Sequence, residues 1–295
     1  MTFVQDTYIR LQYIIRMFFV INILFFALIV TMQANHTIDV VIPCHAKDMR
    51  TLGRAIRGIK KHGKHIRRVI VVSAERLTTE AEWCDERVYP FTKDDLVRAI
   101  FEHNAGGLDA YNKAGRPRIG WLYQQLLKLY APFVIPQISS NVLVLDADTI
   151  FLRDIEFIDN EGFALFNVGN EHHIPYFEHA GRLVPGLQKV YPQYSGITHH
   201  MLFQNHILED LFKEIVHVHN TEPWKALCAC IDHQHLRESA LSEYEIYFNF
   251  AFSRNYKVKI RSLKWENALF DEGSIKRHQQ AGYHYISCHL WDCYA

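Results

Sequence analysis

The chain has 295 residues, a length that fits one large domain or two small ones. Hydrophobic residues make up 49% of the chain, which provides a substantial core and excludes an intrinsically disordered protein. Lys plus Arg equals Asp plus Glu at 32 each, so the overall charge gives no reason to expect a nucleic-acid partner.

The amino-terminal region contains a long apolar run. Residues 17–34 are apolar apart from three polar side chains, and two arginines precede them. A run of this length can span a thin bilayer, and the positive-inside rule places residues 1–16 in the cytosol. We therefore expect a single-pass type II membrane protein with an uncleaved signal anchor. Residues 37–295 are expected to form one domain, on the lumenal side of the Golgi or endoplasmic reticulum in a eukaryote. A cleaved signal peptide is the alternative.

The cysteine pattern leaves the redox state open. Six cysteines fit disulfides in a lumenal protein but do not require them. The C-A-C at 228–230 and the C-H-L-W-D-C at 288–293 lack the paired C-x-x-C spacing of a structural zinc site.

The expected elements alternate between strands and helices. A strand over 37–43, a helix over 49–61 and a strand over 68–73 form a βαβ unit, which predicts an α/β fold with a parallel sheet. The later expected elements, in chain order, are a strand over 86–91, a helix opened by a capping box at Thr92, a polar loop over 104–117, a helix over 118–131 ended by Pro132, a strand over 141–145, a strand over 162–168, a polar turn over 195–200, helices over 204–219 and 242–254, and strands over 256–263 and 283–291.

An acid pair follows the most apolar of these strands. Residues 142–145 are β-formers of the kind found in strands buried on both faces, and Asp146 and Asp148 come directly after them. Side chains at i and i+2 of a strand lie on one side, ~6.6 Å apart along it. Ligands of α/β proteins bind beyond the carboxyl ends of strands. The pattern predicts a site for Mg²⁺ or Mn²⁺ carrying a diphosphate. The alternative is a solvated turn in which Asp148 acts as a cap.

The helix over 118–131 carries an unusual polar stripe. Trp121, Gln124, Gln125 and Lys128 stand at i, i+3, i+4 and i+7, so they share one face, and leucines occupy the other. This face is expected to contribute to a binding site. The alternative is a solvated face, because Gln and Lys are good surface helix formers.

Five segments together resemble a known family. They are V-I-P-C-H-A-K-D at 41–48, G-W-L-Y-Q-Q-L-L-K-L at 120–129, V-L-D-A-D-T-I-F-L at 144–152, T-H-H-M-L-F at 198–203 and S-E-Y-E-I-Y at 242–247. In this order they are similar to a family of predicted glycosyltransferases, still labelled a domain of unknown function, within the nucleotide-diphospho-sugar transferase superfamily. The resemblance implies a GT-A fold, a Rossmann-like mixed sheet whose carboxyl edge binds a nucleotide sugar.

The resemblance also implies roles for individual residues. Asp146 and Asp148 resemble the D-x-D pair that holds Mn²⁺, or Mg²⁺, against the donor diphosphate. Residues implied to lie at the nucleotide-diphospho-sugar donor are Pro43, Trp121, Gln124, Gln125, Lys128 and Asp146. In relatives a histidine near the carboxyl end completes the metal shell; His289 is the nearest match here and His284 the fallback.

The chemistry that this implies follows from charge. Cleavage of the sugar–diphosphate bond puts negative charge on the leaving phosphate, which the cation and Lys128 would stabilise. An acceptor hydroxyl needs a carboxylate or imidazole nearby if the reaction inverts. Candidates for this base or acceptor contact are Glu243, Glu245, His199 and His200. Glu245 also suits a capping box with Ser242 at the helix start.

Three other classes of protein remain as alternatives. A nucleotidyltransferase would share the βαβ start and the acid pair, but residues 44–47 lack its usual Gly-rich signature. A metallohydrolase is suggested by the H-x-H pairs at 217–219 and 233–235, which lack accompanying strand-end acids. A non-catalytic, membrane-tethered binding domain is the third. The preferred interpretation is a transferase acting on a nucleotide sugar and a carbohydrate acceptor.

Overall fold

The computed structural model describes residues 36–288, and those from Ile38 onward belong to one compact unit. The strands are β1 (Ile38–Pro43), β2 (Ile66–Ser73), β3 (Glu82–Asp85), β4 (Asn141–Leu145), β5 (Thr149–Phe151), β6 (Ala164–Phe166), β7 (His200–Gln204), β8 (Val258–Ile260), β9 (Trp265–Asn267) and β10 (Tyr285–Ser287). The α-helices are α2 (Met49–His62), α3 (Lys93–Ile100), α4 (Ala105–Lys113), α5 (Ile119–Val134), α6 (Ile174–Leu183), α7 (Asn205–His219), α8 (Pro223–Ala229), α9 (Glu243–Ser253) and α10 (Glu272–Gln280).

The expected membrane anchor over 17–34 lies outside the described residues. Between residues 36 and 288, no helix is long and apolar enough to cross a membrane.

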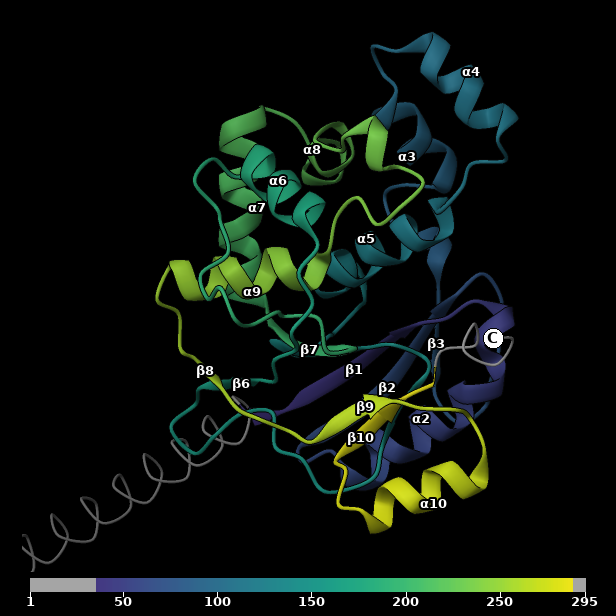
Figure 1. The fold of residues 1–295 in the computed structure, drawn as a ribbon, viewed down its shortest axis with the longest axis vertical. Coiled ribbons are helices and arrows are strands. Elements are labelled where there is room, and N and C mark those ends of the chain that lie inside the picture. The colour runs from purple at the N-terminus through teal and green to yellow at the C-terminus, as the bar shows by residue number, and fades with distance from the viewer. Residues whose placement is uncertain (1–35, 289–295) are drawn as a thin grey trace, which may run out of the picture. The chain divides into compact units, whose positions relative to one another are not determined.

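The central sheet is mixed and mostly parallel, which confirms the expected α/β architecture. Its five strands run in the order β3-β2-β1-β4-β7 (Figure 1). The first four are parallel to their neighbours, and β7 is antiparallel to β4. The chain leaves β1 toward β2 and β3, then returns to place β4 on the other side of β1. The order of strands therefore reverses between β1 and β4, where open α/β sheets bind ligands.

Helices cover both faces of this sheet. In Figure 1, α5 lies above the sheet, where it contacts β1 and β4, and α2 lies below it. Gly58 allows α2 to pack closely on β5, because a Cβ at this position would approach the backbone nitrogen and oxygen of Phe151 to 3.0 Å. The apolar strands of the sheet are thus buried on both faces, as the continuous run at 142–145 predicts.

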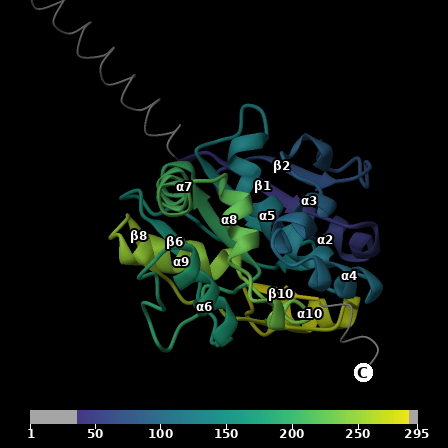
Figure 2. The same cartoon turned by 90° about the horizontal axis from the view of Figure 1, so that it is seen from above.

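A smaller sheet pairs β10, the last strand of the described residues, with β5 from the middle of the chain. It has the order β5-β10-β9, and β10 runs antiparallel to β5, with Ser287 opposite Thr149. In Figure 2, β10 and α10 lie together at one edge of the molecule. This pairing places Ser287 next to the segment that follows β4.

Two expected elements in the first half of the chain are wrong. The third strand is Glu82–Asp85 rather than 86–91, because the Asp85 side chain accepts a hydrogen bond from the backbone of Arg87 and starts a 3₁₀ turn there. The expected loop over 104–117 contains α4, which projects from the rest of the domain in Figure 1. Asn104 caps this helix by accepting from the backbone nitrogen of Gly107 at 2.8 Å.

The helix before the acid pair continues further than expected. Pro132 lies inside α5, which ends at Val134 instead of stopping at residue 131. Three other predictions are confirmed. Both ends of α2 and of α7 lie within one residue of the expected bounds, and Thr92 forms a capping box with Asp95.

Candidate functional site

The acid pair lies in a tight turn rather than on a strand. Strand β4 ends at Leu145, and the backbone nitrogen of Thr149 donates to the carbonyl oxygen of Asp146 at 3.1 Å. Asp146 and Asp148 are both half-buried. The strand ends where it was expected to end, but the two acids do not have the i and i+2 geometry of a strand, because a hydrogen-bonded turn begins at Asp146. We call residues 146–148 the D-A-D turn.

The D-A-D turn lies beside the end of β1. Strands β1 and β4 are parallel neighbours, so their carboxyl ends meet at the same edge of the sheet. The Gln124 amide nitrogen donates to the carbonyl oxygen of Pro43 at 3.2 Å, which ties α5 to this edge. Pro43, Gln124 and the acid pair, expected to share one site, are therefore brought to one place.

Lys128 is buried and connects two acids. It is 2% exposed, and its Nζ lies 2.5 Å from Asp146 Oδ1 and 2.6 Å from Glu243 Oε1. Burial works to lower the pKa of Lys128, but the carboxylates of Asp146 and Glu243 outweigh it and hold the pKa well above its ordinary value. Lys128 is therefore charged, and the solvated-face alternative is wrong for this residue.

Glu243 lies behind Lys128, away from solvent. It is 1% exposed, and Gln125 donates to its carboxylate when the amide nitrogen of Gln125 faces it. Burial raises the pKa of Glu243, although Lys128 opposes this. Because both neighbours cover its carboxylate, the geometry argues against Glu243 as a base that meets an acceptor hydroxyl. Its position suits the role of a counter-charge that holds Lys128.

Asp146 is held by three side chains. Its Oδ1 accepts from Lys128 and, at 3.3 Å, from the Tyr244 hydroxyl, and its Oδ2 lies 3.3 Å from Nδ1 of His199. Burial would raise the pKa of Asp146, but Lys128 and His199 outweigh it and hold the pKa well below its usual range. A carboxylate has about four lone-pair sites, so one site on Oδ2 remains for a cation.

Asp148 is contacted by residues at the end of β10. The Ser287 hydroxyl donates to Asp148 Oδ1 at 3.2 Å, and the backbone nitrogen of Cys288 donates to the carbonyl oxygen of Asp148 at 2.9 Å. Asp48, five residues after β1, lies near the same edge. Burial raises the pKa of Asp48, and the negative charges of Asp148 and Asp146 add to this effect. The edge therefore gathers three acids from two strand ends.

The two adjacent histidines have different surroundings. His199 adopts a left-handed backbone conformation with φ 64°, which is rare for a non-glycine residue, and its ring packs edge-on against Trp265. His200 points the other way, into a buried cluster with Phe151 and Tyr285. Burial lowers the pKa of His200 to about 3. His199 therefore remains a candidate for the site, whereas His200 belongs to the core.

Glu245 lies in the core as well. It accepts from the Ser195 hydroxyl at 2.6 Å and from the Asn249 amide at 2.8 Å, and burial raises its pKa. Its backbone nitrogen donates to the side chain of Ser242, which is the N-cap of α9. The helix start expected at Ser242 is confirmed. The carboxylate of Glu245 faces these partners rather than Asp146, so its placement argues against a catalytic role.

The remaining expected residues are placed as follows. Trp121 is half-buried at the start of α5, where the Arg118 guanidinium lies 4.7 Å from its ring centre. His284 lies before β10, and its Nδ1 accepts from the backbone nitrogen of Lys264 at 3.0 Å. His289 lies outside the described residues. Within residues 36–288, no group of three or more His, Cys, Asp or Glu could hold a metal ion.

The histidine pairs that suggest a metallohydrolase have other partners. His219 Nε2 lies 2.8 Å from the carbonyl oxygen of Leu183, and His233 Nε2 lies 2.9 Å from that of Ile100. These contacts give both rings a structural role. The thiols of Cys44, Cys84, Cys228 and Cys230 are free.

Sequence reasoning missed three residues of this site: Asp48, Tyr244 and Ser287. Two of them were within quoted motifs, since Asp48 ends the 41–48 segment and Tyr244 follows Glu243. The position of Ser287, two residues before His289, was the only signal for its contact with Asp148.

The comparisons with known proteins place the chain in a family. It belongs to the family described as "Family of unknown function (DUF6492)", which matches residues 19–284. No curated protein matches the chain. Among solved structures, the chain is similar to the apo crystal structure of mouse xyloside xylosyltransferase 1. The two are 14% identical with a TM-score of 0.41, over 86% of this chain and 98% of that one.

Proposed function

We propose that this chain is a metal-dependent glycosyltransferase that moves a sugar from a nucleotide-diphosphate donor to an acceptor hydroxyl. The acceptor would be a glycan, glycoprotein or glycolipid, and residues 17–34 would anchor the enzyme in the membrane. One observation carries the proposal: the D-A-D turn lies at the carboxyl end of β4, beside the end of β1, where the strand order reverses. The motif resemblance adds the reaction class.

Asp146 and Asp148 would be the protein ligands of a hard divalent cation such as Mn²⁺ or Mg²⁺. Asp146 retains one lone-pair site on Oδ2, and Asp148 comes from the same turn. Further ligands would be oxygens of the donor and water, with His289 as the protein candidate. When bound, the cation would supply positive charge against the diphosphate.

The buried network would fix the first of these acids. Lys128 holds Asp146, Glu243 holds Lys128 and Gln125 donates to Glu243, so the Asp146 carboxylate is oriented before any ligand arrives. In this arrangement Lys128 acts mainly through Asp146 rather than by touching the phosphates. His199, next to Asp146, is the remaining candidate among the expected bases.

Thermal unfolding with nucleotide and metal tests the proposal. We expect UDP or GDP together with Mn²⁺ to raise the unfolding temperature, since a ligand at 100 times its Kd stabilises the folded state by about 2.7 kcal/mol. Asp148→Asn should lose this shift. The matched control is Asp109→Asn, which changes an exposed aspartate on α4 and should keep it.

The outcomes separate the rival functions. No stabilisation by any nucleotide–metal pair, or an equal shift in Asp148→Asn, would contradict the proposal. Stabilisation with nucleotide and metal, followed by turnover of a nucleotide sugar, supports a glycosyltransferase. Turnover of a nucleoside triphosphate with a sugar phosphate would instead indicate a nucleotidyltransferase. If nucleotide and metal bind but no donor is turned over, the result would indicate a non-catalytic binding domain.

A further inference from the structure

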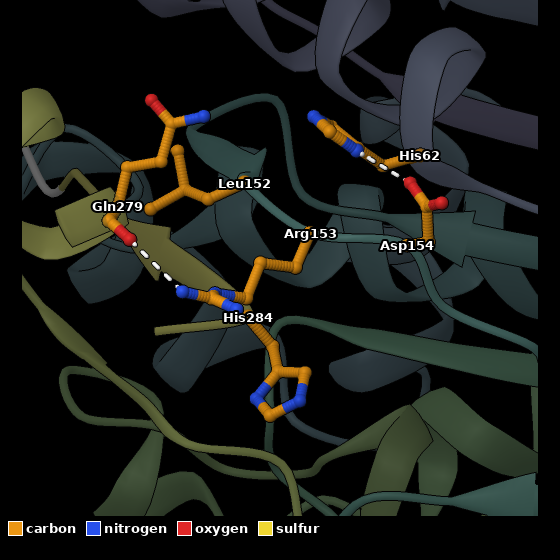
Figure 3. A pocket seen from close by; sticks show the side chains of 6 residues that line it. All are labelled: His62, Leu152, Arg153, Asp154, Gln279 and His284. Atoms are coloured by element: carbon orange, nitrogen blue, oxygen red, sulfur yellow. Dashed lines mark hydrogen bonds and ion pairs between the residues drawn. The ribbon is translucent and has the colours of Figure 1, made fainter. Parts of the chain in front are cut away.

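A polar pocket lies at the opposite end of β5 from the D-A-D turn. Its volume is about 530 Å³, and its lining residues are His62, Leu152, Arg153, Asp154, Gln279 and His284 (Figure 3). Asp148 immediately precedes β5, whereas residues 152–154 follow it, and β10 runs antiparallel alongside. The pocket is therefore separated from the candidate active site by the length of this strand pair.

Arg153 supplies most of the unused hydrogen-bonding capacity. It is exposed, and its hydrogen bond within residues 36–288 runs from Nη2 to the carbonyl oxygen of Gln279, at 3.3 Å. A guanidinium has five N–H donors, so most of the fork remains available to a ligand. The contact with Gln279 caps the end of α10. This capping role does not by itself explain the pocket of about 530 Å³ beside Arg153.

The two histidines of the pocket have defined hydrogen-bonding roles. The backbone nitrogen of Lys264 donates to Nδ1 of His284, so the ring proton of neutral His284 lies on Nε2. On the other side, Nδ1 of His62 lies 2.9 Å from Oδ1 of Asp154 (Figure 3). This contact engages one oxygen of the Asp154 carboxylate. His284 therefore adds a second donor to the pocket, and Asp154 is already engaged.

The charge and shape of the pocket define its ligand. Arg153 is the permanent cation of the lining, and Lys61 and Lys64 lie near enough to Asp154 to stabilise its charge. A guanidinium fork fits the oxygens of a phosphate. The volume falls in the range of small-molecule pockets and exceeds that of a single ion. Apart from Leu152 the lining is polar, which suits a ligand that carries hydroxyl groups.

We propose that this pocket binds a small phosphorylated sugar, with the phosphate on Arg153 and His284 and the hydroxyl groups toward Gln279 and His62. The site is separate from the proposed donor site, and its ligand does not need the D-A-D turn. The proposal does not depend on the transferase activity.

Titration calorimetry on the full chain tests it, with inorganic phosphate, glucose 6-phosphate and glucuronate as probes. We expect saturable binding of glucose 6-phosphate that is weakened about tenfold or more in Arg153→Gln, because a charge-assisted hydrogen bond is lost. Arg50→Gln, which changes an exposed arginine that does not line the pocket, is the matched control and should bind as the wild type does. A second variant, His284→Gln, should weaken phosphate binding while the unliganded protein keeps its unfolding temperature.

The comparison of probes identifies the ligand. Tighter binding of glucose 6-phosphate than of inorganic phosphate supports the proposed sugar phosphate. Equal binding of the two, or tighter binding of glucuronate, would overturn it. So would undiminished binding by Arg153→Gln, or loss of binding in Asp148→Asn, which would place the ligand at the D-A-D turn. If glucose 6-phosphate does not bind but nucleotide and Mn²⁺ still raise the unfolding temperature, only the sugar-phosphate proposal is overturned. If glucose 6-phosphate binds but nucleotide and Mn²⁺ do not raise the unfolding temperature, only the transferase proposal is overturned.

Discussion

The ammonium group of Lys128 and the carboxylate of Glu243 form an ion pair of 2.6 Å between two almost fully buried side chains. Residues 115 positions apart in the chain thus meet behind the D-A-D turn. The same ammonium group holds Asp146 on its other side. Removal of the lysine would leave two acids without their shared cation, and one of them, Glu243, is almost fully buried.

We therefore expect Lys128→Met to lower the free energy of unfolding by about 3–5 kcal/mol, the usual effect of breaking a buried ion pair from one side. Urea unfolding measures this. Lys128→Met combined with Glu243→Met should recover part of the loss, because it removes one of the two stranded charges. Lys213→Met, which breaks an exposed pair with Asp210, serves as the control and should have a much smaller effect. An equally small effect of Lys128→Met would contradict the buried network.

Asp148 is expected to be essential for sugar transfer but not for folding. Its side chain is half-buried at the surface edge of the D-A-D turn, and its contact from Ser287 is a single hydrogen bond at 3.2 Å. Asp148→Ala should reduce transfer by at least about 100-fold, because a metal ligand is lost, while circular dichroism and the unfolding midpoint stay close to wild type. EDTA should also abolish transfer, and added Mn²⁺ should restore it. Wild-type turnover in the mutant or in EDTA would rule out the metal assignment.

Glu245 should behave in the opposite way from Asp148. Glu245→Ala removes the acceptor of the Ser195 hydroxyl proton and one of the two acceptors of the Asn249 amide, which costs about 1–3 kcal/mol of unfolding free energy. Because its carboxylate faces away from Asp146, the thermal shift with nucleotide and Mn²⁺ should persist in this variant. If Glu245→Ala keeps full stability but its unfolding temperature no longer rises with nucleotide and Mn²⁺, Glu245 would instead belong to the binding site.

Acid is expected to destabilise the fold through a buried histidine. His179 is fully buried, with Nε2 2.9 Å from the carbonyl oxygen of Leu227, and burial lowers its pKa from 6.5 to about 4. The unfolded state therefore binds the proton more readily. The stability that His179 contributes is complete above about pH 6.5 and is lost as the pH falls toward 4, by roughly 3 kcal/mol. His200 acts in the same direction.

Urea unfolding between pH 7 and pH 4 tests this dependence. His179→Gln should lower stability at neutral pH but flatten its slope with pH, because one titrating group is gone. His103→Gln changes an exposed histidine and should keep the wild-type slope. If the His179→Gln slope matches that of the wild type, the acid sensitivity has another origin.

The fold could be predicted from local patterns where those patterns are strong. The βαβ start, the strand before Asp146 and the N-cap at Ser242 were all evident, because apolar periodicity and capping chemistry act over a few residues. The helix α4 was missed because its Gly-Gly pair resembles a loop, although Asn104 supplies a cap. Strand β3 was displaced because the apolar residues at 89 and 91 pack into the core from an irregular segment.

The sequence predicted which residues gather at this edge of the sheet, but not how their side chains are connected. The acid pair and two residues of the polar face of α5, Gln124 and Lys128, meet at the carboxyl edge of the sheet, as expected. The sequence did not reveal that Lys128 is buried between Asp146 and Glu243, since those contacts span 18 and 115 residues. A lysine on a helix is usually exposed, and only tertiary packing reverses that expectation. For the same reason Glu243 resembled a surface acid of the first helical turn.

The hydrogen bond from Ser287 to Asp148 joins residues 139 positions apart. During synthesis on the ribosome, the D-A-D turn can form soon after β4 emerges, but its second aspartate gains this partner only after another 139 residues have been made. A nascent protein that lacks β10 therefore has the D-A-D turn without the support of Ser287, and this edge of the sheet takes its final form only once β10 has been made.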